Sequence, residues 1–225
     1  YPIVDQGKCT LCGKCETHCN FNAIITTKKN VMVFDDLCHD CGMCKLVCDE
    51  NAIQYNQKSL GNIIYSTTDG DKNFMYGKLK TGEVSGVKLI ESLKEANKDT
   101  KNYIIDCPPG VACNTSLSID GVDHAIIVTE PSPFGLSDMK MVVELLRKKH
   151  IPFGVVINKA GLGHFDIKSY LKTENIKHYG DIRYSKLRAE LYSKGKLLIE
   201  TDSTYEKELD FIMNSLLRDA GDKYA

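Results

Sequence analysis

CTLCGKCETHC at residues 9–19 returns 29 positions later as CHDCGMCKLVC at residues 38–48. Both segments have the spacing C-x2-C-x2-C-x3-C, and the similarity continues past the cysteines, where the tripeptide NAI occurs at 22–24 and again at 51–53. Eight of the ten cysteines of the chain lie in these two runs. Repetition at a fixed offset indicates the duplication of one small structural unit. The first part of the chain is therefore predicted to hold two copies of one cysteine-bearing loop.

The spacing of these cysteines suits an iron–sulfur cluster better than other uses of cysteine. Three thiolates on one tight loop can hold three corners of a four-iron cube, and a fourth cysteine supplies the last corner. A disulfide framework requires an oxidising compartment and is typical of short secreted chains. Structural zinc sites commonly use two separated cysteine pairs. We therefore predict two [4Fe–4S] clusters, and clusters with a purely structural role remain an alternative.

The repeat resembles the two-cluster bacterial ferredoxins over residues 1–57. In those proteins the last cysteine of each run ligates the cluster of the other run. The resemblance implies one cluster on Cys9, Cys12, Cys15 and Cys48, and another on Cys38, Cys41, Cys44 and Cys19. Asn20 and Asp49 stand where many ferredoxins have proline after the fourth cysteine, which removes no ligand. Gly13 and Gly42 are expected where a side chain would crowd the loop.

The composition of the 225 residues is that of a globular protein, with 42% hydrophobic and 26% charged residues. A formal net charge of -1 gives no electrostatic reason to expect nucleic acid or an anionic membrane as a partner. The longest apolar runs are shorter than the roughly 20 residues that a membrane-spanning helix needs. We therefore expect a cytoplasmic protein with no nucleic-acid partner and no membrane partner.

After residue 58 the pattern changes to alternating strands and helices. Strands are predicted at 62–68, 72–80, 103–107, 124–129 and 153–158, with turns at 69–71 and 81–82. Helices are predicted at 87–97, 139–150, 166–174, 185–194 and 204–219. Nearly continuous apolar strands that alternate with helices indicate a parallel sheet covered on both faces. We therefore predict an α+β ferredoxin domain at residues 1–58, followed by an α/β domain at residues 59–225.

In such sheets the functional residues gather at the carboxyl ends of the strands. Three of these ends read IIDCPPG (104–110), VTEPSPFGLSD (128–138) and GVVINK (154–159). An acid at the tip of a buried strand can hold a water of Mg2+, as the second acidic motif of P-loop NTPases does. The glycine amide of a Pro-Pro-Gly turn can meet a terminal phosphate. The alternatives are an ordinary strand-to-turn junction at 104–110 and a strand-end capping role for Asn158.

These three segments, in this order and spacing, resemble the MinD/ParA-type P-loop ATPases of the SIMIBI class, and in particular the members with an inserted two-cluster ferredoxin domain. The resemblance covers essentially the whole chain. It implies that Asp106 is the catalytic, Mg2+-linked acid and that Pro108 and Gly110 form the switch that senses the last phosphate. Asn158 lies where these ATPases bind adenine. Arg183 stands where a second adenine-side loop usually has proline, so its role is open.

The nucleotide-binding loop of such ATPases is missing from the sequence. No G-x-x-x-x-G-K-[ST] motif occurs, nor does its K-G-G-x-G-K form. Because that loop supplies backbone amides and a lysine to the phosphates, the chain as written is expected to bind ATP poorly. We expect the loop and the first strands of the sheet to precede Tyr1 in a longer protein, and a sheet without them has an apolar edge. The alternative is a relative that kept the ferredoxin and lost the ATPase.

The sequence thus predicts an iron–sulfur protein that couples low-potential electron transfer through two [4Fe–4S] clusters to ATP binding or hydrolysis, with Mg2+, in the intact protein. It is an ATPase only if an upstream segment supplies the missing loop. The expected partners are a redox protein and a second copy of the complete protein. Two other functions stay open: a plain ferredoxin-type electron carrier on a degenerate ATPase scaffold, and an ATPase that assembles iron–sulfur or other metal cofactors. Residues 114–225 contain no cysteine, which weighs against the last.

Overall fold

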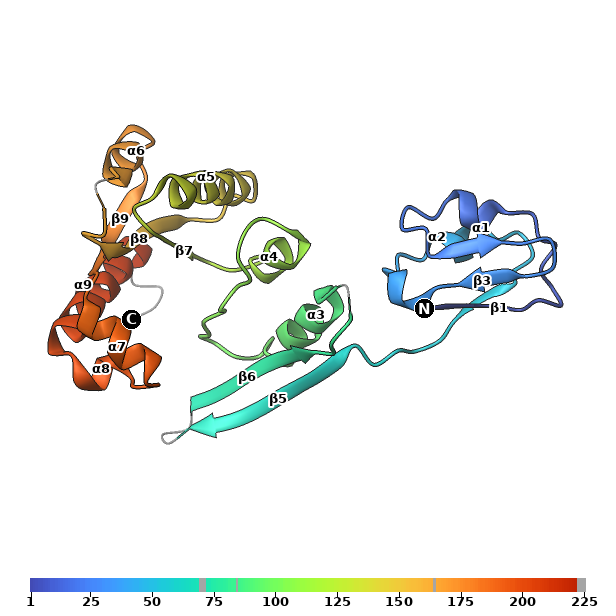
Figure 1. Cartoon of the computed structure of the whole chain (residues 1–225), viewed down its shortest axis with the longest axis horizontal. Helices are drawn as coiled ribbons and strands as arrows, with labels where there is room; N and C mark the ends of the chain where they lie inside the picture. Colours follow the sequence, from blue (N-terminus) through green and yellow to red (C-terminus); the bar gives the residue numbers. More distant parts are fainter. Residues whose placement is uncertain (69–71, 84, 164, 222–225) are drawn as a thin grey trace. The chain divides into compact units, whose positions relative to one another are not determined.

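The computed structural model describes residues 1–68, 72–83, 85–163 and 165–221 (Figure 1). The chain divides into two compact units, Tyr1–Ile105 and Asp106–Ala225. The turn predicted at residues 69–71 lies outside the described residues. Within the described part of the chain, no helix is long and apolar enough to cross a membrane.

The first 57 residues form the duplicated fold that the cysteine repeat predicts. Strand β1 (Pro2–Val4) pairs with β4 (Ile53–Tyr55), and β2 (Ile24–Thr26) pairs with β3 (Val31–Val33), both antiparallel. The helices α1 (Lys14–Thr17) and α2 (Met43–Leu46) each begin inside a cysteine run, and a 3-10 turn, η1 (Asp35–Leu37), precedes the second run. Ile24, Val31 and Ile53 pack in one core with Cys15 and Cys44. Cysteine side chains are therefore part of this small core.

The two cysteine loops share a backbone conformation as well as a sequence. The φ angle is left-handed at Gly13 (76°) and Gly42 (80°), and again at Leu11 (55°) and Asp40 (53°). A Cβ added at either glycine would meet no described protein atom within 4 Å. The expectation that protein atoms would crowd a side chain there was therefore wrong. The backbone angle requires glycine, because residues with a Cβ rarely adopt it.

The rest of the first unit is a hairpin that carries one helix. Strands β5 (Gly61–Thr68) and β6 (Lys72–Leu79) pair antiparallel along their whole length, and α3 (Val87–Ala96) packs on them. A Cβ at Gly77 of β6 would lie 2.8 Å from the side chain of Leu89, so this glycine lets the helix approach closely. The strands predicted at 62–68 and 72–80 and the helix predicted at 87–97 are confirmed.

The second unit holds a parallel three-stranded sheet in the order β7 (Ala125–Thr129), β8 (Phe153–Ala160) and β9 (Lys177–Arg183). Helix α5 (Pro133–Lys148) connects β7 to β8, and α6 (Ile167–Thr173) connects β8 to β9. The short α4 (Cys113–Ser118) precedes the sheet, while α7 (Lys186–Ser193), α8 (Leu198–Thr201) and α9 (Ser203–Ala220) follow it (Figure 1). The predicted α/β alternation is confirmed, and β9 is a strand that the sequence did not predict.

The central strand β8 is covered on both faces. Val155 belongs to the main core with Met139 and Val143 of α5, whereas Val156 packs with Tyr179 and Ile212 on the opposite face. Helix α9 supplies Ile212, so α5 and α9 cover opposite faces of the sheet.

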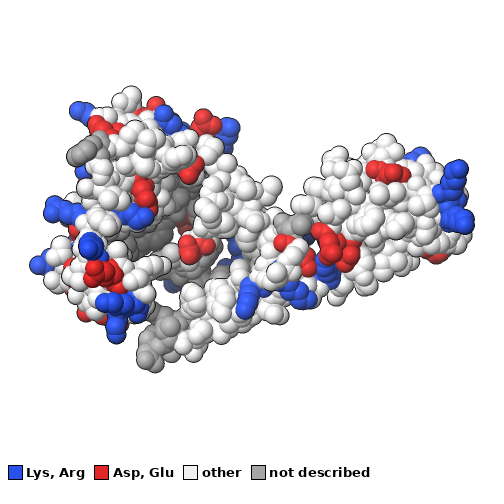
Figure 2. Space-filling model, viewed as in Figure 1, with Lys and Arg blue, Asp and Glu red and all other residues white. Residues whose placement is uncertain are grey.

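On the face of the second unit shown in Figure 2, acidic and basic side chains are mixed.

The outer strand β7 is covered on one face only. Ile127 and Thr129 are buried, whereas Ile126 and Val128 are 43% and 61% exposed. The prediction of a sheet covered on both faces therefore holds for β8 and is wrong for β7, an edge strand with exposed apolar side chains.

Residues 103–107 do not form the strand predicted for them. Ile104 is 96% exposed and Tyr103 is 47% exposed, so this apolar run is not buried either. The backbone N–H and C=O groups of a strand need a neighbouring strand as their partner. None of the strands that the structure describes pairs with this segment. An apolar run without a neighbour stays irregular.

Candidate functional site

Cysteines of the two runs lie together in the small core of the first unit. One pocket is lined by a cysteine of the first run and by three of the second, Cys19, Cys38, Cys41 and Cys44. Its other walls are mainly apolar and aromatic, with Phe21 stacked on His39 at a centroid distance of 4.0 Å. The fourth cysteine of one run is thus beside the first three of the other.

Equivalent backbone amides donate to the fourth cysteine of each run. The N–H of Ala23 donates to Cys19 Sγ, and the N–H of Ala52 donates to Cys48 Sγ, both at 3.3 Å. Donors aimed at sulfur favour the thiolate, which is the form that binds iron. The NAI tripeptide shared by both repeats therefore has a structural reason, because its alanine supplies this amide.

Each repeat has one hydroxyl residue at the same strand position, eleven residues after the third cysteine of its run. The hydroxyl of Tyr55 lies 3.2 Å from Cys44 Sγ. The Oγ1 of Thr26 is buried with no hydrogen-bond partner among the described residues. It belongs to the strand whose Ile24 packs with Cys15, and burial raises the pKa of the Cys15 thiol. Neither hydroxyl group was predicted from the sequence, although the 29-residue offset aligns them.

This donor set fits an iron–sulfur cube better than a single metal ion. Among the described residues, no group of three or more His, Cys, Asp or Glu side chains could hold one ion. A four-iron cube contains its own sulfides, so it keeps the cysteine sulfurs farther apart than a single ion does. Four cysteines around an apolar pocket, amide donors to sulfur and a buried hydroxyl without a protein partner all suit such a cube.

Asp49, which stands where many ferredoxins have proline, pairs with Lys14 of the other loop. The two side chains are 72% and 50% exposed, so water screens the pair and it contributes little to stability. The departure from the ferredoxin pattern thus adds a contact between the two loops without altering a cysteine.

In the second unit, the carboxyl ends of β7 and β8 lie side by side, because the strands are parallel neighbours. Glu130, just after β7, forms an ion pair of 2.5 Å with Lys159 of β8. The Oδ1 of Asn158 accepts the N–H of Lys159 at 2.9 Å, and Lys159 has a left-handed φ of 53°. The Asn158 side chain thus bonds to the backbone of the next residue near the end of β8. The Glu130–Lys159 pair was not predicted.

The turn after β7 is tightly packed. Ser132 caps α5 by accepting the N–H of Gly135 at 3.0 Å, and the Thr129 hydroxyl donates to the Gly135 carbonyl at 3.0 Å. A Cβ at Gly135 would lie 2.3 Å from the carbonyl oxygen of Glu130, so only glycine fits. Because Ser132 supplies the cap and Pro133 suits the first turn, α5 begins before the predicted residue 139.

Asp106, Pro108 and Gly110 lie on the irregular segment that leads to α4. Asp106 is exposed, and Gly110 has a left-handed φ of 80°. The buried Thr115 of α4 donates to the carbonyls of Pro108 and Pro109 at 3.1 and 3.2 Å, which fixes the turn to the helix. The described hydrogen bonds do not join Asp106 to Asn158.

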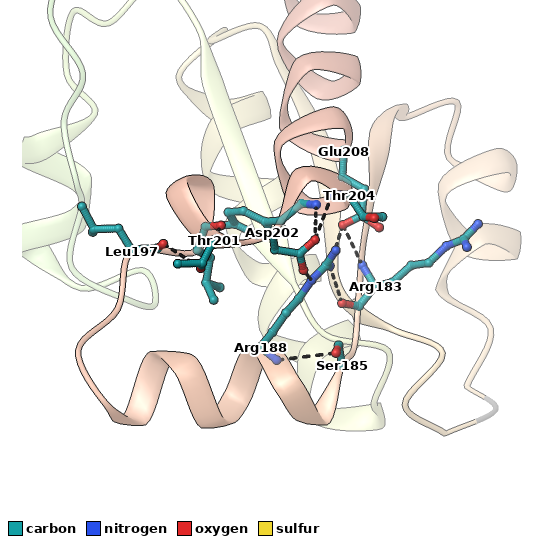
Figure 3. A network of polar contacts seen from close by, with 10 residues as sticks. Arg183, Ser185, Arg188, Leu197, Thr201, Asp202, Thr204 and Glu208 are labelled. Carbon is teal, nitrogen blue, oxygen red and sulfur yellow. Dashed lines mark hydrogen bonds and ion pairs between the residues drawn. The ribbon is translucent and has the colours of Figure 1, made fainter.

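A buried arginine holds the carboxyl end of β9 (Figure 3). Arg188 of α7 is 8% exposed, and its guanidinium donates to Asp202 and Glu208 at 2.7 Å each. It also donates to the Arg183 carbonyl at 2.9 Å, while the Arg183 side chain extends away from the network (Figure 3). The bond from Arg188 lowers the pKa of Asp202, which also caps α9. Position 183 is thus fixed through its backbone.

Comparison with known proteins identifies the first part of the chain. Residues 2–25, which contain the first cysteine run, match the 4Fe-4S binding domain family Fer4. The chain carries a 4Fe-4S ferredoxin domain. Over 184 residues it is 28% identical to the uncharacterized protein MJ0579 of Methanocaldococcus jannaschii, and over 170 residues it is 37% identical to MJ0578 of the same organism. These alignments cover 81% and 74% of this chain but 64% and 58% of the relatives, so the chain spans less than two thirds of their length.

Two solved structures have a fold similar to part of this chain. The cell division ATPase MinD of Pyrococcus furiosus superposes with a TM-score of 0.56 and 21% identity, covering 68% of each chain. The septum site-determining protein MinD of Pyrococcus horikoshii, solved in complex with Mg-ADP, gives 0.51 and 20%, covering 63% of this chain and 60% of the other. At these identities the similarity shows the fold alone. A ferredoxin domain and a MinD-like fold therefore share one chain.

Proposed function

We propose that this chain carries electrons at low potential through two [4Fe–4S] clusters and that the intact protein couples their transfer to ATP binding or hydrolysis. The observation that supports this most is the pocket in which cysteines of both runs meet, within a ferredoxin domain that shares one chain with a MinD-like fold. When bound, each cluster supplies a one-electron couple. The electron comes from a low-potential donor protein and passes to an acceptor protein.

The proposed ligand sets follow the two-cluster ferredoxins. The pocket supports the set Cys38, Cys41, Cys44 and Cys19. The symmetry of the repeat supports the set Cys9, Cys12, Cys15 and Cys48, because the loops share their left-handed residues and their amide–sulfur bonds. Within each set, the third cysteine is buried and the second is exposed, so each site has one side toward the core and one toward water.

The nucleotide side of the proposal involves the carboxyl end of the sheet. Asp106 holds a water of Mg2+, the turn of Pro108 and Gly110 faces the last phosphate, and Asn158 contacts adenine. The turn fixed by Thr115 supports a switch that moves together with α4. The intact protein acts as a homodimer with a redox partner protein. Its ferredoxin domain covers residues 1–58, and its ATPase part covers residues 59–225. The ATPase part thus includes the hairpin and α3, which belong to the same compact unit as the ferredoxin fold.

The test uses the full-length protein with its clusters intact and with its clusters removed. ATP hydrolysis is measured in both forms, and electron paramagnetic resonance (EPR) of the reduced protein is recorded with and without ATP. Coupling predicts a change in the hydrolysis rate on cluster removal and a change in the EPR signal on ATP addition. Asp106→Ala should abolish the ATP response without loss of iron. Independence of hydrolysis and cluster signals refutes the coupling.

A plain electron carrier on a degenerate ATPase scaffold is the second candidate. The cysteine pocket supports it equally, because electron transfer needs only the clusters. Reversible reduction of the full-length protein, with no nucleotide binding by equilibrium dialysis, would identify this function.

A further inference from the structure

The two repeats of the ferredoxin domain place a hydroxyl residue at the same position. Thr26 ends β2 and Tyr55 ends β4, and each follows the third cysteine of its run by eleven positions. Both strands have the same pattern of a buried, an exposed and a half-buried residue. Because side chains alternate along a strand, the third residue returns to the face of the buried first one, which is the core that holds the cysteines.

One hydroxyl lies beside a cysteine sulfur, and the other is buried without a partner among the described residues. The Tyr55 oxygen lies 3.2 Å from Cys44 Sγ and lines the pocket with Cys19, Cys38 and Cys41. The Thr26 oxygen is buried on the strand whose Ile24 packs with Cys15, and no described protein atom accepts its hydrogen bond. A buried hydroxyl without a partner costs free energy, so an acceptor at this position is favourable. A sulfur of a bound cluster is the acceptor that the surroundings offer.

We propose that Thr26 and Tyr55 each donate a hydrogen bond to a sulfur of the cluster beside them and thereby set the two reduction potentials apart. The inference rests on the proposed presence of two clusters. A donor to sulfur stabilises the additional negative charge of the reduced state, so it raises the potential. A phenol is a more acidic donor than an aliphatic alcohol, and its bond lies in an apolar pocket where hydrogen bonds are stronger. The cluster beside Cys44 therefore has the higher potential.

Removal of one hydroxyl at a time tests the assignment in the full-length protein. Tyr55→Phe and Thr26→Val keep the side-chain shape and delete the donor. At a fixed solution potential, Tyr55→Phe should lower the reduced-to-oxidised ratio of its own cluster about fivefold, the effect of roughly one hydrogen bond. Thr26→Val should lower the ratio of its own cluster by a smaller factor, and neither variant should change the other cluster. EPR-monitored potentiometry measures the ratios, and paramagnetic NMR of the cysteine β-protons assigns each couple to its ligands.

Matched controls make the same chemical changes away from the cysteines. Tyr65→Phe and Thr67→Val, both on exposed positions of β5, should leave both potentials unchanged. If Tyr55→Phe fails to retain iron, 3-fluorotyrosine labelling keeps the ring and makes the donor more acidic. The label should raise only the potential of the cluster beside Cys44.

Different results would contradict the two-cluster proposal and the roles proposed for Thr26 and Tyr55. Fewer than about eight iron atoms per chain in the unmodified protein contradicts the two-cluster proposal itself. Full iron content with unmoved potentials, or with both clusters shifted equally by each variant, overturns the roles of Thr26 and Tyr55 and leaves the two-cluster proposal intact.

Discussion

The ferredoxin fold at residues 1–57 and the α/β unit at Asp106–Ala225 build their candidate sites in different ways. In the ferredoxin fold, one contiguous run supplies three of the four cysteines proposed for each cluster, and every strand finds its partner within the same short segment. In the α/β unit, Glu130 and Asn158 come from the ends of different strands, and Asp106 precedes both. A site of the second kind depends on each neighbouring strand.

A site whose residues come from one run of the chain can therefore form even where a site built from several strand ends does not. Residues 103–107 have the composition of a strand but no strand partner among the described residues, so the segment that carries Asp106 is irregular. If the two regions are built independently, a change in one should leave the other intact.

The largest effect is expected for Cys44→Ser. Cys44 is 8% exposed and belongs both to the core and to the proposed ligand set. The variant should lose about half of its iron and unfold its ferredoxin domain at a lower temperature, because metal binding contributes directly to folding. Iron analysis and calorimetry measure the two effects. Cys113→Ser, an exposed cysteine outside the runs, should change neither. A lowered transition of the α/β unit in Cys44→Ser would contradict independence.

Arg188→Met is expected to be the most damaging single change in the α/β unit. It leaves the carboxylates of Asp202 and Glu208 without their cation in a largely enclosed site (Figure 3). Loss of one partner from a buried charge pair typically costs about 3 kcal/mol of unfolding free energy. Denaturant titration of the α/β transition measures this loss. Arg183→Met, whose side chain extends away from the network, is the control and should cost far less. Equal losses of unfolding free energy in the two variants would show that the missing positive charge, and not the buried network, causes the destabilisation.

The ferredoxin repeat could be predicted almost completely, because spacing and offset are local properties of the chain. The strands at 125–129 and 153–160 could be predicted from their continuous apolar runs. Strand β9 (KHYGDIR) could not be predicted in this way. Its sequence is mainly polar, and Tyr179 is its one deeply buried side chain. The Arg188 network was also missed. Its partners are 14 and 20 positions away, and only the tertiary fold brings these charges together.

Gly154→Ala should destabilise the α/β unit by about 2 kcal/mol, a typical cost of overpacking. A Cβ at this position of β8 would lie 2.3 Å from the ring of Tyr179, which is fully buried and cannot move aside easily. Calorimetry should show a lower α/β transition with unchanged iron content. Loss of iron in this variant would mean that the two regions are coupled through the sheet.

The stability of the α/β unit should fall in acid through His124 and Asp219. Tyr179 donates to Asp219 at 2.7 Å and lies 2.6 Å from His124 Nε2. Burial lowers the pKa of His124, and the bond from Tyr179, followed by Lys177, lowers the pKa of Asp219. Both groups therefore bind protons more readily in the unfolded state of the protein than in the folded state. Their contributions are therefore complete above the ordinary pKa values of 6.5 and 3.8 and decline as the pH falls below each.

Thermal unfolding between pH 7.5 and about 5 isolates the histidine step. His124→Asn should flatten that part of the profile, whereas His150→Asn, at the end of α5, should leave it unchanged. A profile that keeps its slope in His124→Asn would assign the acid sensitivity to other groups.

The smallest effect is expected where the two repeats differ at the surface. Leu46 is 81% exposed, and its counterpart in the first repeat is Thr17. Two other exposed apolar residues, Leu37 and Met43, have lysine counterparts, so the second repeat is less polar than the first at these three positions. Leu46→Thr should change the unfolding free energy by less than about 0.5 kcal/mol, as exposed substitutions usually do.

Ile24→Thr, at a position only 2% exposed, provides the contrast to Leu46→Thr and should cost several-fold more in denaturant titration. If Leu46→Thr is as damaging as Ile24→Thr, the apolar surface of the second loop serves the stability of the fold. If stability and both reduction potentials are unchanged, the difference between the loops has no role inside the domain.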